Sequence, residues 1–236
     1  MILEVAGISV EVLKKKIKNL HLAVLPPDGA VRVSEPETFP DAAITMFVRT
    51  RLGWIRKQRE TFEQQPRQSI RRYVSGESFY LWGRQYFLSV RYGNRGNSLT
   101  LSGDRAILTV RRTSTVKQRE SFVREWYRSF LKTEIEKRLP FWERKTELFC
   151  SSWQTKYMTT LWGTCNTKTG KVWLNLQLAK KPLECLDYVI LHELTHLKYR
   201  RHDDCYIAFL DAHMPYWREK RKTLNESTLD HLPMKL

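Results

Sequence analysis

Two histidines and a glutamate in the last third of the chain have the spacing of a metal-dependent hydrolytic centre. His192 and His196 are four residues apart in the segment LHELTHLKYRRHDD, and Glu193 directly follows the first of them. Residues four apart on a helix project from the same face, so both imidazoles can bind one ion. His202, six residues after His196, is the expected third ligand. The spacing therefore predicts a metal site.

These residue types favour zinc. Zinc binds neutral imidazole nitrogens at about 2.0–2.1 Å, and a catalytic site keeps one coordination position open for water. We expect one Zn2+ per chain. Asp203 and Asp204 are alternative ligands, although imidazole suits zinc better than carboxylate oxygen does. Glu193 is the predicted general base, which acts on the water without binding the metal.

Three polar residues after the glutamate are candidates for contact with the transition state. Tyr199, Tyr206 and His213 lie close in sequence to the predicted ligands, so each is a candidate donor to the oxyanion. The remaining histidines, His21 and His231, are expected at the surface or with ordinary hydrogen-bond partners.

A helix and a strand must position this site. Apolar side chains recur every three or four residues over residues 183–199, which predicts a helix with one face on the core. Pro182 suits its first turn. Residues 171–179 have the pattern of a strand, which would pair with an extended peptide substrate by strand addition. The apolar stripe of the helix comprises Leu183, Leu186, Ile190, Leu194 and Leu197.

The upstream sequence alternates between strand-like and helix-like patterns. Apolar runs flank PPDG at residues 26–29, which predicts a hairpin, and helical spacing predicts one helix over residues 41–62. Residues 72–112 return to strands, with hairpins expected at Trp82-Gly83 and at residues 102–104.

A long helix follows this second group of strands. Thr115 and Gln118 form a possible capping box at its start, and Pro140 is expected to end or kink it. The fold class is therefore α+β, with a β-rich region carrying one helix over residues 1–112 and a catalytic region over residues 113–236. The apolar stripe expected on the long helix comprises Val116, Val123, Trp126, Phe130 and Leu139.

The composition is that of a globular protein. Of the 236 residues, 42% are hydrophobic and 12% are aromatic. No apolar run approaches the roughly 20 residues that span a bilayer, and no secretory signal opens the chain, so no membrane partner is expected. The four cysteines form no CxxC pair, which is typical of a reduced, cytoplasmic protein.

A net charge of +16 predicts attraction to polyanions, although a basic surface without a dedicated ligand explains it equally well. The segments 49–59 and 111–119 carry mostly positive charge and are the candidate surfaces for nucleic acid or nucleotides. Neither contains a base-reading motif.

Several segments together carry a resemblance to a known family. LWGTC at residues 161–165, LNLQL at 174–178, LDYVILHELTHL at 186–197, HDDCY at 202–206 and MPYW at 214–217 resemble the YgjP-like metallopeptidases. Two upstream segments, FVRTRLGWIRKQ and GESFYLWGRQYFLSV, resemble the helix before the family's central strands and the family's characteristic hairpin.

The resemblance implies a zincin-like fold, in which an N-terminal β-rich part packs against an α+β catalytic part. It also implies that His192, His196 and His202 bind zinc and that Glu193 is the catalytic base. Residues beside the family's cleft correspond here to Trp162, Gly163, Thr164 and Asn175, whose alternative roles are structural.

Three residues depart from the sequence patterns of the YgjP-like family and of the metzincins, and these departures affect the predicted function. The family usually has a lysine and an arginine before its tryptophan, where this chain has Thr159 and Leu161, which weakens an anion-binding role. Tyr199 occupies the position of the metzincin glycine, so a metzincin is not expected.

The predicted activity is a zinc metallopeptidase acting on proteins or peptides. One alternative is a pyrophosphatase acting on nucleoside triphosphates such as UTP, an activity attached to some members of the family. The other is a DNA-associated protease, because the related SprT-like and Wss-type zincins act on DNA–protein crosslinks and the basic charge is compatible with DNA.

Overall fold

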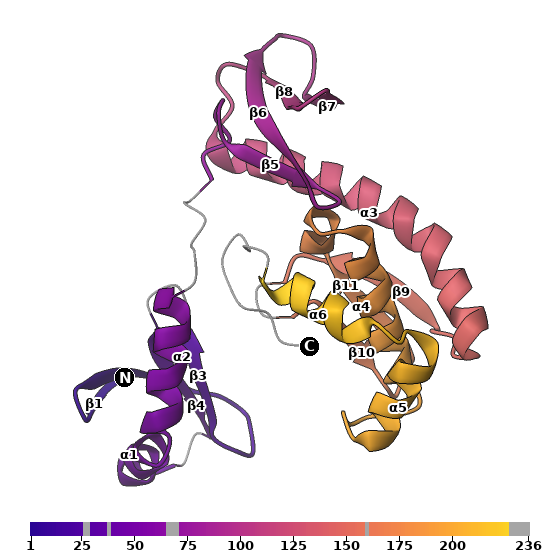
Figure 1. Ribbon diagram of the computed structural model, residues 1–236. Coiled ribbons are helices and arrows are strands. Elements are labelled where there is room, and N and C mark those ends of the chain that lie inside the picture. Colours follow the sequence, from indigo (N-terminus) through magenta and orange to yellow (C-terminus); the bar gives the residue numbers. More distant parts are fainter. Residues whose placement is uncertain (26–28, 37–38, 65–70, 159–160, 227–236) are drawn as a thin grey trace. The chain divides into compact units, whose positions relative to one another are not determined.

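Short strands form three small sheets with helices packed on them in this computed structural model (Figure 1). The described residues are 1–25, 29–36, 39–64, 71–158 and 161–226. They form two units, one before residue 65 and one from residue 71 to residue 226. The mixture of sheets and helices confirms the α+β class.

The first unit contains a four-stranded sheet in the order β1-β2-β4-β3. β3 and β4 pair antiparallel, which confirms the hairpin, although Pro26, Pro27 and Asp28 of its turn lie outside the described residues. Alternate side chains of the strands enter the core, as the two-residue period of a strand requires. The strands are β1 (Ile2–Val5), β2 (Ile8–Lys14), β3 (His21–Leu25) and β4 (Ala30–Glu35).

Two helices complete this unit, where the sequence pattern predicts one. They are α1 (Asp41–Arg49) and α2 (Leu52–Gln64), so the prediction of a continuous helix is wrong. The Thr50 hydroxyl and the Arg51 guanidinium donate to the carbonyl oxygen of Phe47, at 3.0 and 3.1 Å. That oxygen would otherwise accept from the Arg51 amide, which bonds to Val48 instead, so the first helix ends here.

The second unit begins with a four-stranded sheet in the order β5-β6-β8-β7. Both expected hairpins are confirmed by antiparallel pairing of β5 with β6 and of β7 with β8. The turn residues Trp82, Gly83 and Gly103 have φ of 49°, 80° and 59°, the left-handed backbone that tight hairpins require. The strands are β5 (Ser78–Leu81), β6 (Arg84–Tyr92), β7 (Ser98–Ser102) and β8 (Arg105–Val110).

The long helix α3 (Val116–Thr146) runs along the second unit (Figure 1). Its capping box is confirmed. The Thr115 hydroxyl accepts from the Gln118 amide at 3.2 Å, and the Gln118 side chain accepts from the Thr115 amide at 2.9 Å. These two bonds satisfy amide groups that the helix itself leaves without partners.

Pro140 does not end α3, which continues for six more residues to Thr146, so that half of the expectation is wrong, and a kink at Pro140 stays a prediction. The expected buried stripe is wrong in part. Val116 and Phe130 are 46% and 37% exposed, so they do not belong to the buried stripe. Val123 and Leu139 are buried as expected, whereas Tyr127 and Leu131 take the places expected for Trp126 and Phe130. The buried stripe comprises Arg119, Val123, Tyr127, Leu131, Ile135, Leu139, Trp142 and Thr146.

The third sheet has β11 in its centre, in the order β10-β11-β9. The strand predicted over residues 171–179 is shorter, because the Asn175 side chain accepts from the Gln177 amide at 3.1 Å and begins a 3-10 helix, η1 (Leu176–Lys180). The strands are β9 (Ser152–Lys156), β10 (Gly163–Asn166) and β11 (Lys171–Asn175).

Three helices follow this sheet. They are α4 (Leu183–Thr195), α5 (Asp204–His213) and α6 (Trp217–Glu226). α4 ends four residues before the expected Tyr199, and Pro182 is its N-cap and not part of its first turn. α3 holds α4 in place, because Trp142 Nε1 donates to Asp187 at 2.9 Å and Arg138 pairs with the same carboxylate.

The second compact unit begins before residue 71, whereas the regions expected from the sequence are divided after residue 112. Sheet β5–β8 belongs to the same unit as α4, whereas the sequence pattern places it in the N-terminal region 1–112. The roles assigned to residues 1–112 and 113–236, and the packing of one on the other, stay predictions. No helix among the described residues is long and apolar enough to cross a membrane.

Candidate metal centre

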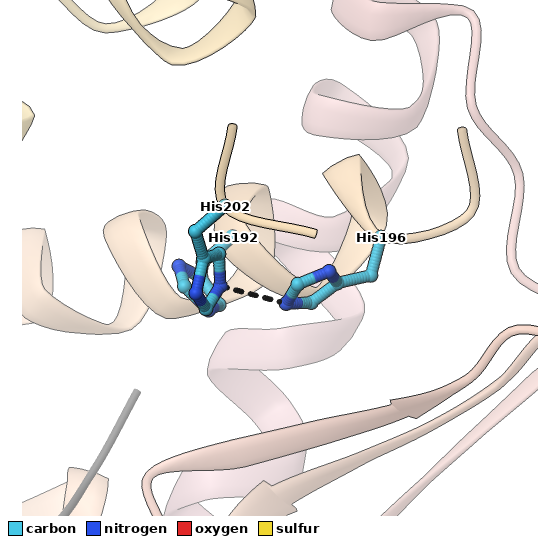
Figure 2. Close-up of side chains that lie close together, drawn as sticks. All are labelled: His192, His196 and His202. Atoms are coloured by element: carbon cyan, nitrogen blue, oxygen red, sulfur yellow. Dashed lines mark hydrogen bonds between the residues drawn. The ribbon is translucent and has the colours of Figure 1, made fainter. Parts of the chain in front are cut away.

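The three histidines of the motif converge, although only two of them come from one helix (Figure 2). His192 lies in the last turn of α4, and His196 is the C-cap of that helix. The loop after α4 returns His202 to the pair, with its Nε2 atom 3.3 Å from His192 Nε2 and 3.1 Å from His196 Nε2. The candidate ligand atoms all lie within 4.8 Å of one another, so one ion could contact all three.

The protonation of the three rings suits a cation. Burial lowers the pKa of His192, and neighbouring histidines and the charge of Arg221 lower it further. Burial likewise lowers the pKa of His196 and of His202. The rings are therefore neutral at pH 7, and neutral imidazole is the form that binds metal. Nitrogen lone pairs that face one another repel, and a shared cation removes that repulsion.

The loop between the second and third histidines orients the second ring. His196 Nδ1 lies 3.1 Å from the carbonyl oxygen of Tyr199. This nitrogen therefore carries the proton and donates it to the carbonyl, which leaves Nε2 free to face the cluster. Tyr199 thus reaches the site through its backbone, while its ring lies 5.7 Å from Phe209.

Glu193 lies on the buried side of the cluster. It is 2% exposed, and burial raises its pKa to about 8. Gly163, the first residue of β10, lies against it. A Cβ atom on Gly163 would lie only 2.4 Å from Glu193 Oε1, so this position has room for glycine alone. The start of β10 and the carboxylate therefore pack directly against each other.

Tyr206 forms a wall of the site. Its ring centroid lies 5.4, 5.1 and 4.6 Å from those of His192, His196 and His202. Its hydroxyl is buried and donates to the backbone carbonyl of His192 at 3.2 Å. The hydroxyl is thus engaged within α4, which favours a positioning role over a role as oxyanion donor.

His213 is not brought into the cluster. Its ring stacks on Phe209 with centroids 4.1 Å apart, and its Nδ1 donates to the Phe209 carbonyl at 2.8 Å. It lies at the far end of α5 from His202, because that helix begins at Asp204 and His213 is its last residue.

The residues before β10 hold that strand in place. Asn175 is fully buried and donates to the carbonyl oxygens of Leu161 and Met158 at 2.6 and 2.9 Å. Trp162 is also fully buried and donates from Nε1 to Asn225 of α6 at 3.4 Å. Thr164 lies half-buried within β10. Thr159, one of the positions where a basic residue is usual, lies outside the described residues.

Replacing the buried amide tests this support. We expect Asn175→Ala to lower the free energy of unfolding by about 2–4 kcal/mol, because two partly buried carbonyl groups each lose a donor and the buried side chain is removed. Urea unfolding of both proteins measures the difference. Asn94→Ala removes an exposed amide and should change stability by less than about 0.5 kcal/mol. Equal effects of the two substitutions would contradict the assigned role.

Sequence reasoning missed two residues at the site. Tyr188 lies one turn before His192, with ring centroids 5.8 Å apart, and stacks on Trp217 of α6 at 5.9 Å. Arg221 of α6 acts electrostatically on His192 and on His202. The spacing of Tyr188 and His192 in YVILH could have indicated the first. Nothing local indicates the second, because α6 reaches the site only through tertiary packing.

The two basic segments belong to different units of the fold. Residues 111–119 join β8 to α3, beside a hollow of about 650 Å³ lined by polar side chains and by Arg111 and Lys117. None of the three histidines lines this hollow. Residues 49–59 belong to the first unit. These placements do not support nucleic-acid binding.

The chain is similar to known metallopeptidases. A model of the YgjP-like metallopeptidase domain matches residues 18–227, whereas no curated protein matches significantly. Among solved structures, the metallopeptidase zymogen abylysin of Pyrococcus abyssi has 17% identity and a TM-score of 0.36, over 38% of this chain and 90% of that one. A TM-score this low does not indicate a shared fold. The family match covers most of the chain, including the site, and the chain therefore belongs to the YgjP-like metallopeptidase family.

Proposed function

We propose that the chain is a zinc-dependent peptidase, with His192, His196 and His202 as the metal ligands and Glu193 as the general base. The observation that carries this proposal is the convergence of three neutral imidazoles beside a buried carboxylate. Bound zinc would supply a Lewis acid that polarises the scissile carbonyl and activates water. The four free cysteines support the cytoplasm as the compartment.

The chemistry assigned to Glu193 is proton transfer. Its carboxylate accepts a proton from the attacking water as the new carbon–oxygen bond forms, and then donates that proton to the amide nitrogen as the carbon–nitrogen bond breaks. A cation among the three imidazoles favours the ionised carboxylate and so opposes the effect of burial on its pKa. The zincin-like assignment rests on this arrangement of one glutamate between two helical histidines.

The substrate would pair with β10, and not with β11 as the sequence suggested. β11 is the central strand and bonds to a neighbour on each side, so it has no free edge. β10 is an outer strand of that sheet, and its first residue, Gly163, packs on Glu193. An extended peptide added along β10 would therefore lie next to the general base.

Metal binding is tested without any substrate. We expect zinc at about 100 times its dissociation constant to raise the melting temperature by about 5–10 °C, because the ion binds the folded state alone. His196→Ala should abolish this shift, and elemental analysis should find one zinc per chain in the wild type. His213→Ala is the matched control and should keep the full shift. A melting temperature that does not respond to zinc would contradict the assignment.

The substrate class is tested with two substrates. The zinc-loaded protein should release peptide fragments from a denatured protein mixture, and a chelator should stop the reaction until zinc is restored. Mass spectrometry identifies the fragments. Release of UMP and pyrophosphate from UTP, without peptide fragments, would replace the peptidase proposal with the pyrophosphatase alternative. That alternative and the DNA-associated one stay predictions of the sequence.

A further inference from the structure

One cation of α6, Arg221, lies on the face of the helix that packs on α4. Trp217, Arg221 and Leu224 are separated by four and three residues, so they share one face of the helix. Trp217 stacks on Tyr188 of α4, and Leu224 is fully buried. The next residue, Asn225, accepts a hydrogen bond from Trp162. This face of α6 therefore packs on α4 and on the start of β10.

Arg221 is exposed and lies on α6 between Trp217, which stacks on Tyr188, and Asn225, which bonds to Trp162. Tyr188 contacts the ring of His192, and Trp162 directly precedes Gly163. Burial raises the pKa of Tyr188 and of Tyr206, and the positive charge of Arg221 opposes both rises, in addition to its effect on the histidines. Arg221 therefore acts electrostatically on residues around the site from an exposed position on the helix.

The described part of the chain gives Arg221 no acidic partner. Its helix neighbours are engaged elsewhere, since Arg218 pairs with Asp211 and Lys220 pairs with Glu184. The loop between the second and third histidines adds exposed cations at Lys198, Arg200 and Arg201. The acidic residues that follow are Asp203 and Asp204, and the first of these caps α5 by accepting from the Tyr206 amide.

A guanidinium has five donors in a rigid planar fork, which matches the two oxygens of a carboxylate. A peptide substrate offers such groups as aspartate or glutamate side chains, or as its C-terminus. We propose that Arg221 binds a carboxylate of the substrate and so gives the site a preference for acidic peptides. This specificity rests on the proposed peptidase function, and it would supply from α6 the anion recognition that Thr159 and Leu161 do not offer.

Binding is measured first, with zinc-loaded Glu193→Gln protein so that the peptides stay intact. The probes are peptides taken from an observed cleavage site, or from a fixed library if none is cleaved, each paired with a twin in which aspartate and glutamate are replaced by asparagine and glutamine. We expect the acidic peptide to bind roughly 10–100 times more tightly, the range of a hydrogen bond to a charged group. Adding Arg221→Gln should abolish this difference, and Arg221→Lys should restore part of it.

The control is Arg218→Gln, which removes the same charge from the same helix but from a side chain directed at Asp211. It should keep the preference, and zinc content should be equal in all variants. In the cleaving enzyme, the preference should appear in KM more than in kcat, because the contact forms before the reaction.

The outcomes separate the inference from the proposed function. The inference is overturned if Arg221→Gln keeps the preference for the acidic peptide, or if the wild type binds both peptides of a pair equally. The proposed peptidase function is not affected by either result. Binding that depends on Arg221 without any cleavage supports the carboxylate site and overturns the peptidase.

Discussion

Glu193→Gln is expected to lower peptide hydrolysis by about 10²–10⁴-fold, the usual contribution of a positioned general base. Glutamine is nearly the same size as glutamate, so it fits the buried space against Gly163. It cannot accept a proton from water at neutral pH. The change is measured as kcat/KM on a peptide that the wild type cleaves.

The same variant should keep its metal. Glu193 does not belong to the group of side chains that could hold the ion, so zinc content and the zinc-induced rise in melting temperature should match the wild type. Glu184→Gln is the matched control, because Glu184 lies on the same helix and is exposed. It should keep full activity. Loss of zinc in Glu193→Gln, or activity within threefold of the wild type, would contradict the role of general base.

Features carried by short stretches of sequence were predicted well. The hairpins at Trp82-Gly83 and at Gly103 follow from turn residues that accept a positive φ, and the capping box follows from Thr115 and Gln118 alone. These features depend on neighbours a few residues apart, and the chain specifies them locally. The histidines of α4 belong to the same class, because helical spacing fixes their common face.

Features that depend on tertiary packing were predicted poorly. α3 continues past Pro140, because its packing against η1 and α4 outweighs the missing amide hydrogen and the clash of the proline ring. The central position of β11 depends on which strands pair, and pairing partners far apart in sequence leave no local signal. Arg221 acts electrostatically on the histidines only because Trp217 and Leu224 pack its helix on the rest of the unit.

The site thus combines one locally specified helix with elements that tertiary packing brings to it. α4 supplies two histidines and the glutamate, and β10 supplies the surface against which that glutamate packs. The position of β10 depends in turn on Asn175 and Trp162, which hold its first residues. The approach of Gly163 to Glu193 is therefore the contact through which the sheet acts on the proposed general base.

Gly163→Ala tests that contact. We expect hydrolysis to fall by about 100-fold, because the new methyl group overlaps the Glu193 carboxylate, and a displacement of about 1 Å at a catalytic group has an effect of this size. Zinc content should not change. Gly96→Ala is the matched control, since a Cβ atom there meets nothing within 4 Å, and its activity should equal that of the wild type.

A double-mutant cycle separates displacement of the Glu193 carboxylate from general damage to the fold. In the Glu193→Gln background the general base is already absent, so Gly163→Ala should cost much less than its 100-fold effect in the wild type. Glu193→Asp with Gly163→Ala should be more active than Gly163→Ala alone, because the shorter side chain makes room for the methyl group. Equal losses in both backgrounds would mean that Gly163 supports the fold and not the position of the carboxylate.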